Sequence, residues 1–259
     1  MRYGGTFDMV KKMFLVVCFS MFLLANDKEG YREAMIHELH QITALSIITK
    51  DYVMVAMNNT FNNPEKDMQK EIARFNNEQT QLLALPLEKA LHDSIVKQQE
   101  KWEEISAFLQ GATTQENFLK LRKLIYPLRS NMRKQIAMFR KKLNSKQTDT
   151  IYYAGKLSAI SQEFAGIYLL LKWGTNSNMD KLKVDILIQS SMYVDTLSRL
   201  NKIVASDSKE EQILKKLDLY FRYLSYINKS AKTFTPVLVY RKSNMMSKYS
   251  NKIIEIASK

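Results

Sequence analysis

Two histidines one helical turn apart are the residues best suited to metal chemistry. His37 and His40 share a face if their segment is helical, and Glu33 lies one turn before His37. Zinc takes about three or four protein ligands, so His92 would have to join them from another segment. The order His-Glu-Leu-His also differs from the His-Glu-x-x-His arrangement of zinc proteases. We therefore expect surface histidines, with no resident metal or other cofactor.

A basic segment is the second candidate, and its chemistry would be anion binding. Positions 118–143 contain nine lysines and arginines and no acid. The arginines of this segment are spaced by 7, 4 and 7 positions, so they form one stripe of a helix: Arg122, Arg129, Arg133 and Arg140. Without acids beside them, they could bind a small anion, lipid head groups or an acidic protein surface. A solvated helix face is the alternative interpretation.

No catalytic constellation accompanies these groups. The sequence shows no phosphate-binding loop, nucleophile elbow or paired-carboxylate signature. Cys18 is the only cysteine and lies in an apolar run, which leaves the rest of the chain without a thiol nucleophile or a disulfide. Trp102 and Trp173 fall on or near apolar stripes, where core packing is the expected role. We expect a protein that is not an enzyme.

The N-terminus has the organisation of an export signal. Lys11 and Lys12 precede an uncharged apolar run over 13–25, which is short for a bilayer span, and polar residues follow it. We expect cleavage after Ala25 and a periplasmic protein, and an uncleaved anchor in the inner membrane is the alternative. The formal net charge of +13 suits acidic envelope partners. An exported chain without a recognition motif is not expected to bind nucleic acid.

The elements that must position these residues are helices. Only 7 glycines and 4 prolines interrupt the 259 residues, and apolar residues recur at steps of three and four. Eight helical segments are predicted, at about 27–58, 64–85, 87–109, 114–143, 148–173, 179–204, 208–227 and 236–259. Pro127 should kink the fourth segment. Each segment should carry one apolar stripe and one charged face, so that the stripes meet in a bundle.

The second half of the chain repeats the pattern of the first. At an offset of 115 positions, residues 41–46 (QITALS) fall on 156–161 (KLSAIS). Such self-similarity predicts two tandem units, which we expect to be joined by a continuous helix through 140–150. The expected fold is all-α, with a signal segment followed by two up-and-down four-helix units. Their ranges are 1–25 for the signal, 26–145 for the first unit and 146–259 for the second.

Part of the fifth segment also resembles a known signature. Residues 153–165 read YAGKLSAISQEFA, which is similar to the A-G-R-Q-R-M-L-S-Q-R-x-A-K helix of the NarX/PilJ-like sensory domain family. That family forms the periplasmic part of nitrate sensor kinases and of type IV pilus chemotaxis transducers, often as tandem units. The resemblance implies a helical-bundle sensor whose signature helix binds an anion. It marks Lys156, Ser161 and Gln162 as ligand-binding residues.

Two functions are compatible with these observations. The first is a periplasmic sensory or ligand-binding module for a small anion or another small ligand, acting through a separate membrane receptor or kinase. A ligand would then shift the helices between two packing arrangements, and a homodimer is a further expected assembly. The second is a structural or interaction protein of the envelope, which docks an anionic partner through the basic segment 118–143.

Overall fold

The computed structural model describes the backbone of residues 5–173, 179–229 and 235–259, and within these ranges the side chains from residue 28 onward. Over these residues the chain forms eight α-helices and no strand, which confirms the predicted all-α class. The helices are α1 (Gly5–Ala56), α2 (Pro64–Ala84), α3 (Lys89–Leu109), α4 (Gln115–Leu143), α5 (Lys146–Trp173), α6 (Met179–Ile203), α7 (Lys209–Lys229) and α8 (Pro236–Ala257).

Local sequence explains where several of these helices begin. Asn63 is in the left-handed conformation (φ 52°), its side chain accepts a hydrogen bond from the amide three residues on, and Pro64 occupies the first turn of α2. Thr114 caps α4 in the same way, accepting a hydrogen bond from the Asn117 amide at 3.2 Å. Pro127 lies inside α4, and the helix continues across it.

Two expectations about helix ends are wrong. α1 begins at Gly5 rather than near residue 27, so it is continuous with the N-terminal apolar run. No continuous helix joins α4 to α5, because Asn144 takes a left-handed conformation (φ 38°) that ends α4. The hydroxyl of Ser145 then accepts a hydrogen bond from the Thr148 amide at 3.1 Å and starts α5 in a new direction.

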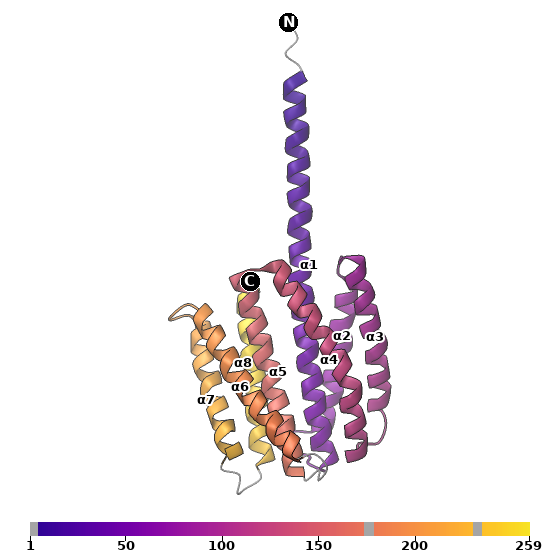
Figure 1. Ribbon diagram of the computed structural model, residues 1–259, viewed down its shortest axis with the longest axis vertical. Coiled ribbons are helices and arrows are strands. Elements are labelled where there is room, and N and C mark those ends of the chain that lie inside the picture. Colours follow the sequence, from indigo (N-terminus) through magenta and orange to yellow (C-terminus); the bar gives the residue numbers. More distant parts are fainter. Residues whose placement is uncertain (1–4, 174–178, 230–234) are drawn as a thin grey trace.

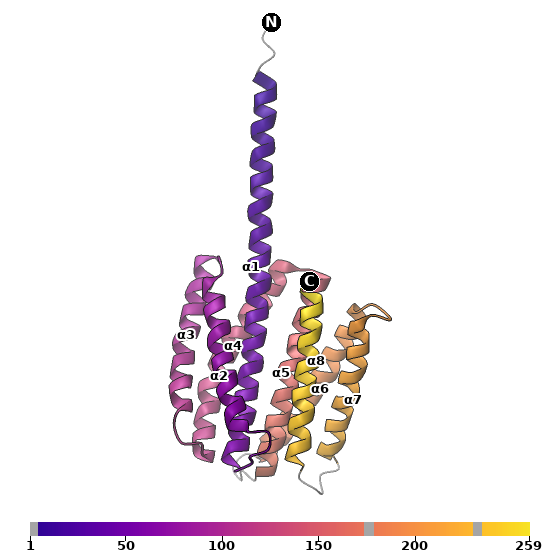
Figure 2. The ribbon, with the colours of Figure 1, turned by 180° about the vertical axis from the view of Figure 1, so that it is seen from behind.

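The central helices α1 and α5 lie side by side (Figure 1, Figure 2). α2 and α4 pack against α1, while α6 and α8 pack against α5. α3 contacts α2 and α4, and α7 contacts α6 and α8. Within each set of four, the first helix therefore contacts the second and the fourth, as in an up-and-down four-helix bundle. The two tandem units at 26–145 and 146–259, and the duplication itself, stay predictions.

The two central helices run parallel and approach each other at two glycines. A Cβ atom on Gly155 would lie 2.8 Å from Leu39 Cδ2, and one on Gly166 would lie 3.8 Å from Lys50 Cα. The residues of both pairs are 116 positions apart, close to the offset of the predicted repeat. Corresponding turns of the two sets therefore face each other across the centre of the molecule.

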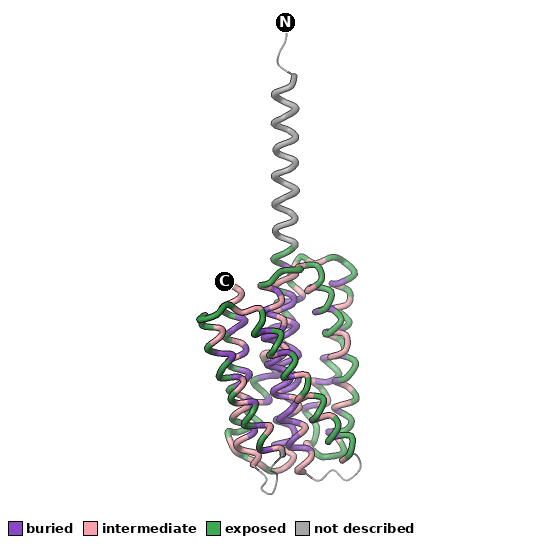
Figure 3. Tube along the Cα trace, turned by 60° about the vertical axis from the view of Figure 1, so that its left-hand side comes forward, coloured by how far each residue is buried: buried purple, intermediate pink, exposed green. Residues whose placement is uncertain are grey.

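α5 is largely buried. Between Thr148 and Leu170 it is exposed only along one narrow stripe, which includes the partly exposed Asp149, Lys156 and Glu163, because α1, α6 and α8 pack around it. Figure 3 shows the same distribution, with burial concentrated in the middle of the bundle and exposed residues on the outer helices. The expected charged face is therefore present on α5, but it is narrow.

The N-terminal part of α1 projects beyond the other helices (Figure 1). In the part of the chain that the structure describes, no helix has the apolar length needed to span a bilayer. The side chains of residues 1–27 lie outside that part, so the export signal and cleavage after Ala25 stay predictions.

Candidate anion-binding cleft

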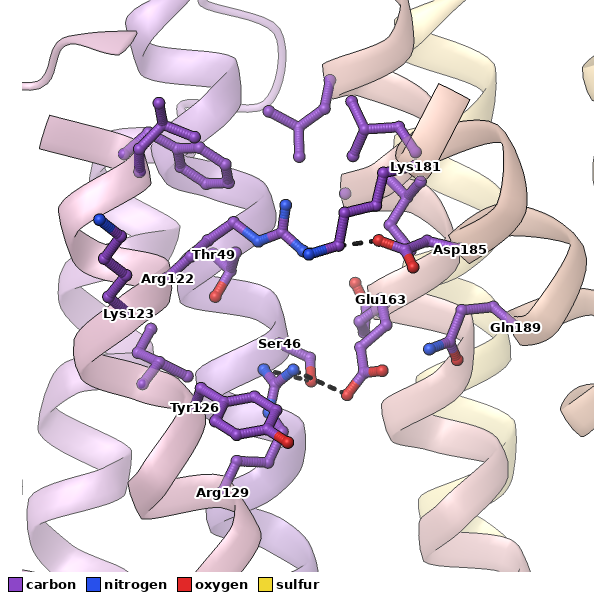
Figure 4. A pocket seen from close by; sticks show the side chains of 18 of the residues that line it. Ser46, Thr49, Arg122, Lys123, Tyr126, Arg129, Glu163, Lys181, Asp185 and Gln189 are labelled. Atoms are coloured by element: carbon purple, nitrogen blue, oxygen red, sulfur yellow. Dashed lines mark hydrogen bonds and ion pairs between the residues drawn. The ribbon is translucent and has the colours of Figure 1, made fainter. Parts of the chain in front are cut away.

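A cleft of about 720 Å³ opens between α4 and α6. α1 and α5 form its floor, so both sets of four helices contribute to it (Figure 4). Its volume is typical of small-molecule sites, which span about 300–1,000 Å³. More basic than acidic side chains line it. The basic ones are Arg122, Lys123, Arg129, Arg133 and Lys181, and the acidic ones are Glu163 and Asp185.

Arg129 is the most buried cation of the cleft, with 17% of its side chain exposed. Its Nη1 lies 2.9 Å from Glu163 Oε1, and its Nη2 donates to the Ser46 hydroxyl at 3.3 Å. Its Nε is buried and has no hydrogen-bond partner among the described residues. Burial lowers the pKa of this guanidinium, and Glu163 opposes that effect. Arg129 therefore joins α4 to α1 and α5 while keeping one donor unused.

Glu163 on α5 is shared between two arginines of α4. Its side chain is 9% exposed, and its Oε1 also lies 3.2 Å from Nη2 of Arg133, which is 53% exposed. The pair with Arg129 holds the first set of helices to the second across the cleft floor. Sequence analysis did not assign this role to Glu163.

A looser ion pair crosses the cleft farther along α4. Arg122 Nη2 lies 3.7 Å from Asp185 Oδ2 on α6, and both side chains are partly exposed. This distance is long for a charge-assisted hydrogen bond, which is about 2.7–2.9 Å. Lys123 and Lys181 line the same region and form no ion pair with any residue that the structure describes. Figure 4 shows the side chain of Arg122 directed across the cleft toward Asp185.

The predicted arginine stripe is divided by the structure. Arg122, Arg129 and Arg133 line the cleft, whereas Arg140 is not among its lining residues. Arg140 instead lies at the junction of α4 and α5, where its Nε donates to Asp149 at 2.6 Å and its Nη2 donates to the Tyr153 hydroxyl at 3.1 Å. Hydrogen bonding to Asp149 raises the pKa of Arg140, so this residue stays charged at the corner between the helices.

The three residues marked by the family resemblance do not form one group. Gln162 lines the cleft, but its Oε1 accepts from Lys50 Nζ at 2.8 Å and its Nε2 donates to the Ser243 carbonyl at 2.8 Å. Ser161 is buried and donates to the Ser158 carbonyl of its own helix at 2.7 Å. Lys156 is partly buried outside the cleft, and burial lowers its pKa while Asp195 opposes the effect.

The two histidines meet a carboxylate that sequence analysis did not anticipate. His37 Nδ1 lies 2.6 Å from Glu78 Oε2, and His40 Nδ1 lies 3.0 Å from Glu78 Oε1. Burial raises the pKa of Glu78, but the hydrogen bonds from both histidines outweigh it and lower this pKa to about 2. Among the described residues, no group of three or more His, Cys, Asp or Glu side chains is placed to hold a metal ion. The cluster joins α1 to α2.

The central helix pair has a cleft on the side of α4 and α6, whereas a polar cluster fills the side of α2 and α8. Lys50 is fully buried, and its Nζ donates to Gln162 and to Asn244 Oδ1 and lies 3.9 Å from the centre of the Tyr240 ring. The hydroxyl of Tyr240 donates to Asp67 Oδ2 at 2.8 Å, which ties α8 to α2. The two sides of the central helix pair are thus filled differently.

Comparisons with models of protein families, with curated proteins and with solved structures found no match for this chain. The function proposed below therefore depends on the cleft geometry and on the sequence patterns already described.

Proposed function

We propose that this chain is a periplasmic sensory module that binds an anionic small molecule in the cleft between α4 and α6 and acts through a separate membrane signalling partner. One observation carries the proposal. The cleft is lined by an excess of basic side chains, and its central ion bridge, Arg129 with Glu163, connects the two sets of helices. An anion bound there competes with Glu163 and Asp185 for the arginines of α4. Binding and helix packing are then coupled.

The floor of the cleft supplies a route for the signal. Ser46 and Thr49 belong to α1, and Arg129 donates a hydrogen bond to Ser46. α1 is one helix from Gly5 to Ala56, so the turns that contact the cleft and the turns that project from the bundle belong to one element. In the alternative form that keeps the N-terminal segment as an uncleaved anchor, a change in the contact between α4 and α1 can therefore move the projecting end of α1, where a membrane partner would bind. Membership of the NarX/PilJ-like family is part of this proposal, supported by the signature-like stretch 153–165 on α5.

The second candidate is an envelope protein that docks an anionic partner through α4. One observation favours it. Tyr126 is 75% exposed on α4 and lies three positions from Lys123 and from Arg129, which also line the cleft. Exposed aromatic side chains among cations are common in protein interfaces. In this case a macromolecule, and no small anion, would bind the wall of the cleft.

A ligand screen by thermal unfolding tests the sensory proposal. The full chain is heated with nitrate, with phosphate and with carboxylates of increasing size, at constant ionic strength. At about 100 times its Kd, a ligand adds about 2.7 kcal/mol, which raises the Tm by about 5–10 °C. The rise should shrink in Arg133→Gln and persist in Lys134→Gln, an exposed lysine of α4 outside the cleft. If no anion raises the Tm of the unaltered chain, the proposal is wrong.

A further inference from the structure

We infer that the ligand of this cleft is an organic carboxylate with an apolar body, and not an inorganic oxyanion. The inference rests on the proposed binding function of the cleft and names its ligand class. It follows from three features of the lining: an apolar wall, a carboxylate that the chain itself supplies to the arginines, and polar groups that lack partners.

The apolar part of the lining is too extensive for an inorganic anion. Its exposed part is formed by Leu119 on α4 and Ile167 on α5, and four nearly buried side chains also border it: Phe118, Ile125, Leu170 and Leu182. A nitrate or phosphate ion would leave most of a 720 Å³ cleft, with Leu119 and Ile167, in contact with water. An alkyl or aromatic body removes these two side chains from water, which is the main favourable term in binding to apolar pockets.

The charged part of the lining already holds a carboxylate. Glu163 occupies Arg129 and Arg133 with one oxygen, at 2.9 and 3.2 Å. Guanidinium groups bind carboxylates through two parallel hydrogen bonds, and the unpartnered Nε of Arg129 is a donor of this kind. Oε1 of Gln189, in the cleft wall on α6, is also buried without a partner and can accept from a hydroxyl or amide group of a ligand.

The head group has room beside Arg122. The 3.7 Å separation between Arg122 and Asp185 is loose, and Lys123 and Lys181 contribute charge that no described acid pairs. A ligand carboxylate that takes the place of Asp185 at Arg122 gains two lysines that Asp185 does not contact. Its apolar body then lies against the exposed apolar side chains of the lining, Leu119 and Ile167.

Isothermal titration of the full chain with four probes tests the inference. Octanoate has both parts of the expected ligand, acetate has only the head, octan-1-ol has only the tail, and inorganic phosphate is an oxyanion without a body. Octanoate should bind at least about tenfold more tightly than each of the others, a difference of about 1.4 kcal/mol. Equal affinity for phosphate overturns the inference and leaves the proposed function standing, whereas no binding of any anion overturns both.

Surface variants locate the two parts of the ligand without disturbing the core. Lys123→Gln combined with Lys181→Gln should weaken octanoate by about tenfold and leave octan-1-ol unchanged, since each lost charge contributes modestly at an exposed site. Lys120→Gln, on α4 but outside the cleft lining, is the matched control. Leu119→Gln should weaken octanoate but not acetate, whereas Met138→Gln, equally exposed on α4 and outside the lining, should change neither. Unchanged octanoate affinity in the lysine pair and in Leu119→Gln contradicts this placement.

Discussion

Glu163 determines how the charges of the cleft are arranged, because its carboxylate receives both Arg129 and Arg133. Arg129 is largely buried, and Glu163 is the acid that pairs with its charge. Removing one member of a buried ion pair leaves the other uncompensated, and this costs more than the pair contributes when intact.

Glu163→Gln should therefore lower the free energy of unfolding by about 2–4 kcal/mol, because Arg129 stays buried without an anion. Urea unfolding at pH 7 measures it. Glu116→Gln removes an exposed glutamate that pairs with Lys120 at the start of α4, and it should leave the stability nearly unchanged. A Glu163 variant as stable as the Glu116 variant would show that the ion bridge does not hold the two helix sets together.

The lowered pKa of Glu78 predicts a loss of stability in acid. Its pKa falls from the usual 4.5 to about 2 in the folded protein, so the folded state holds the proton less tightly than the unfolded chain. The stability that this group contributes is therefore complete above about pH 4.5 and is lost as the pH falls toward 2. Unfolding of the unaltered chain and of Glu78→Gln is measured from pH 7 to pH 2. The two curves should converge below pH 4.5, and a constant difference would contradict the assignment.

At the residue scale, the sequence predicted where the cleft arginines lie better than it predicted the carboxylates that pair with them. The stripe of Arg122, Arg129 and Arg133 follows from helix periodicity alone, and the structure places all three on the cleft. Glu163 comes from the next helix, and Glu78 lies 38 positions from His40, so neither pairing follows from local spacing. The available signal was that Glu163 lies among apolar residues in a helix with few charges, where an acid needs a partner.

At the element scale, α1 packs more closely against Gly155 of α5 than against Gly166. A Cβ atom at Gly155 would lie within 3.0 Å of three atoms of Leu39, whereas one at Gly166 would make only ordinary contacts with Lys50. Glycine in a helix interior costs about 0.5–1 kcal/mol relative to alanine. The two positions should therefore respond to the same substitution with opposite signs.

Gly155→Ala should destabilise the protein by about 1 kcal/mol, because Leu39 must move within a packed interior. Gly166→Ala should stabilise it by about 0.5 kcal/mol, because helix propensity improves without a clash. Chemical unfolding of both variants and of the unaltered chain gives the signs. If both substitutions stabilise the protein, the two central helices are not as close at Leu39 as described.

The helices themselves were predictable because their boundaries have strong local signals. Asn63 with Pro64 and the cap at Thr114 define two starts that sequence and structure share. The corner at Asn144 was not predicted. Good helix formers surround this residue in the sequence, and its left-handed conformation depends on tertiary packing. The extent of burial of α5, which leaves only a narrow charged stripe, was also missed, because it depends on how many helices surround it.

At the scale of the whole molecule, the two sets of helices share one interior. α1 and α5 are the first helices of their sets, and each has the other as a major packing partner. The hydrogen bond from Lys50 to Gln162 crosses the same interface between α1 and α5. Either set alone would expose this surface to water, so we expect the sets divided at residues 145 and 146 to unfold together.

Thermal unfolding of the full chain should therefore give one cooperative transition, with equal calorimetric and van't Hoff enthalpies. The fragment 146–259 should lack that transition when expressed alone, because α5 would lose the helix that covers one of its sides. Calorimetry and circular dichroism of both proteins provide the measurement. Two resolved transitions, or a fragment that melts cooperatively, would show that the sets are separable domains.

The hydrogen bonds of Gln162 link the cleft to α8. Its side chain borders the cleft, yet both of its polar atoms form hydrogen bonds away from the cleft, to Lys50 and to the backbone of α8. Under the proposed function, a ligand that displaces the Gln162 side chain would weaken its hydrogen bonds to Lys50 and to the Ser243 carbonyl. Binding in the cleft would then alter how α8 packs on the central helices.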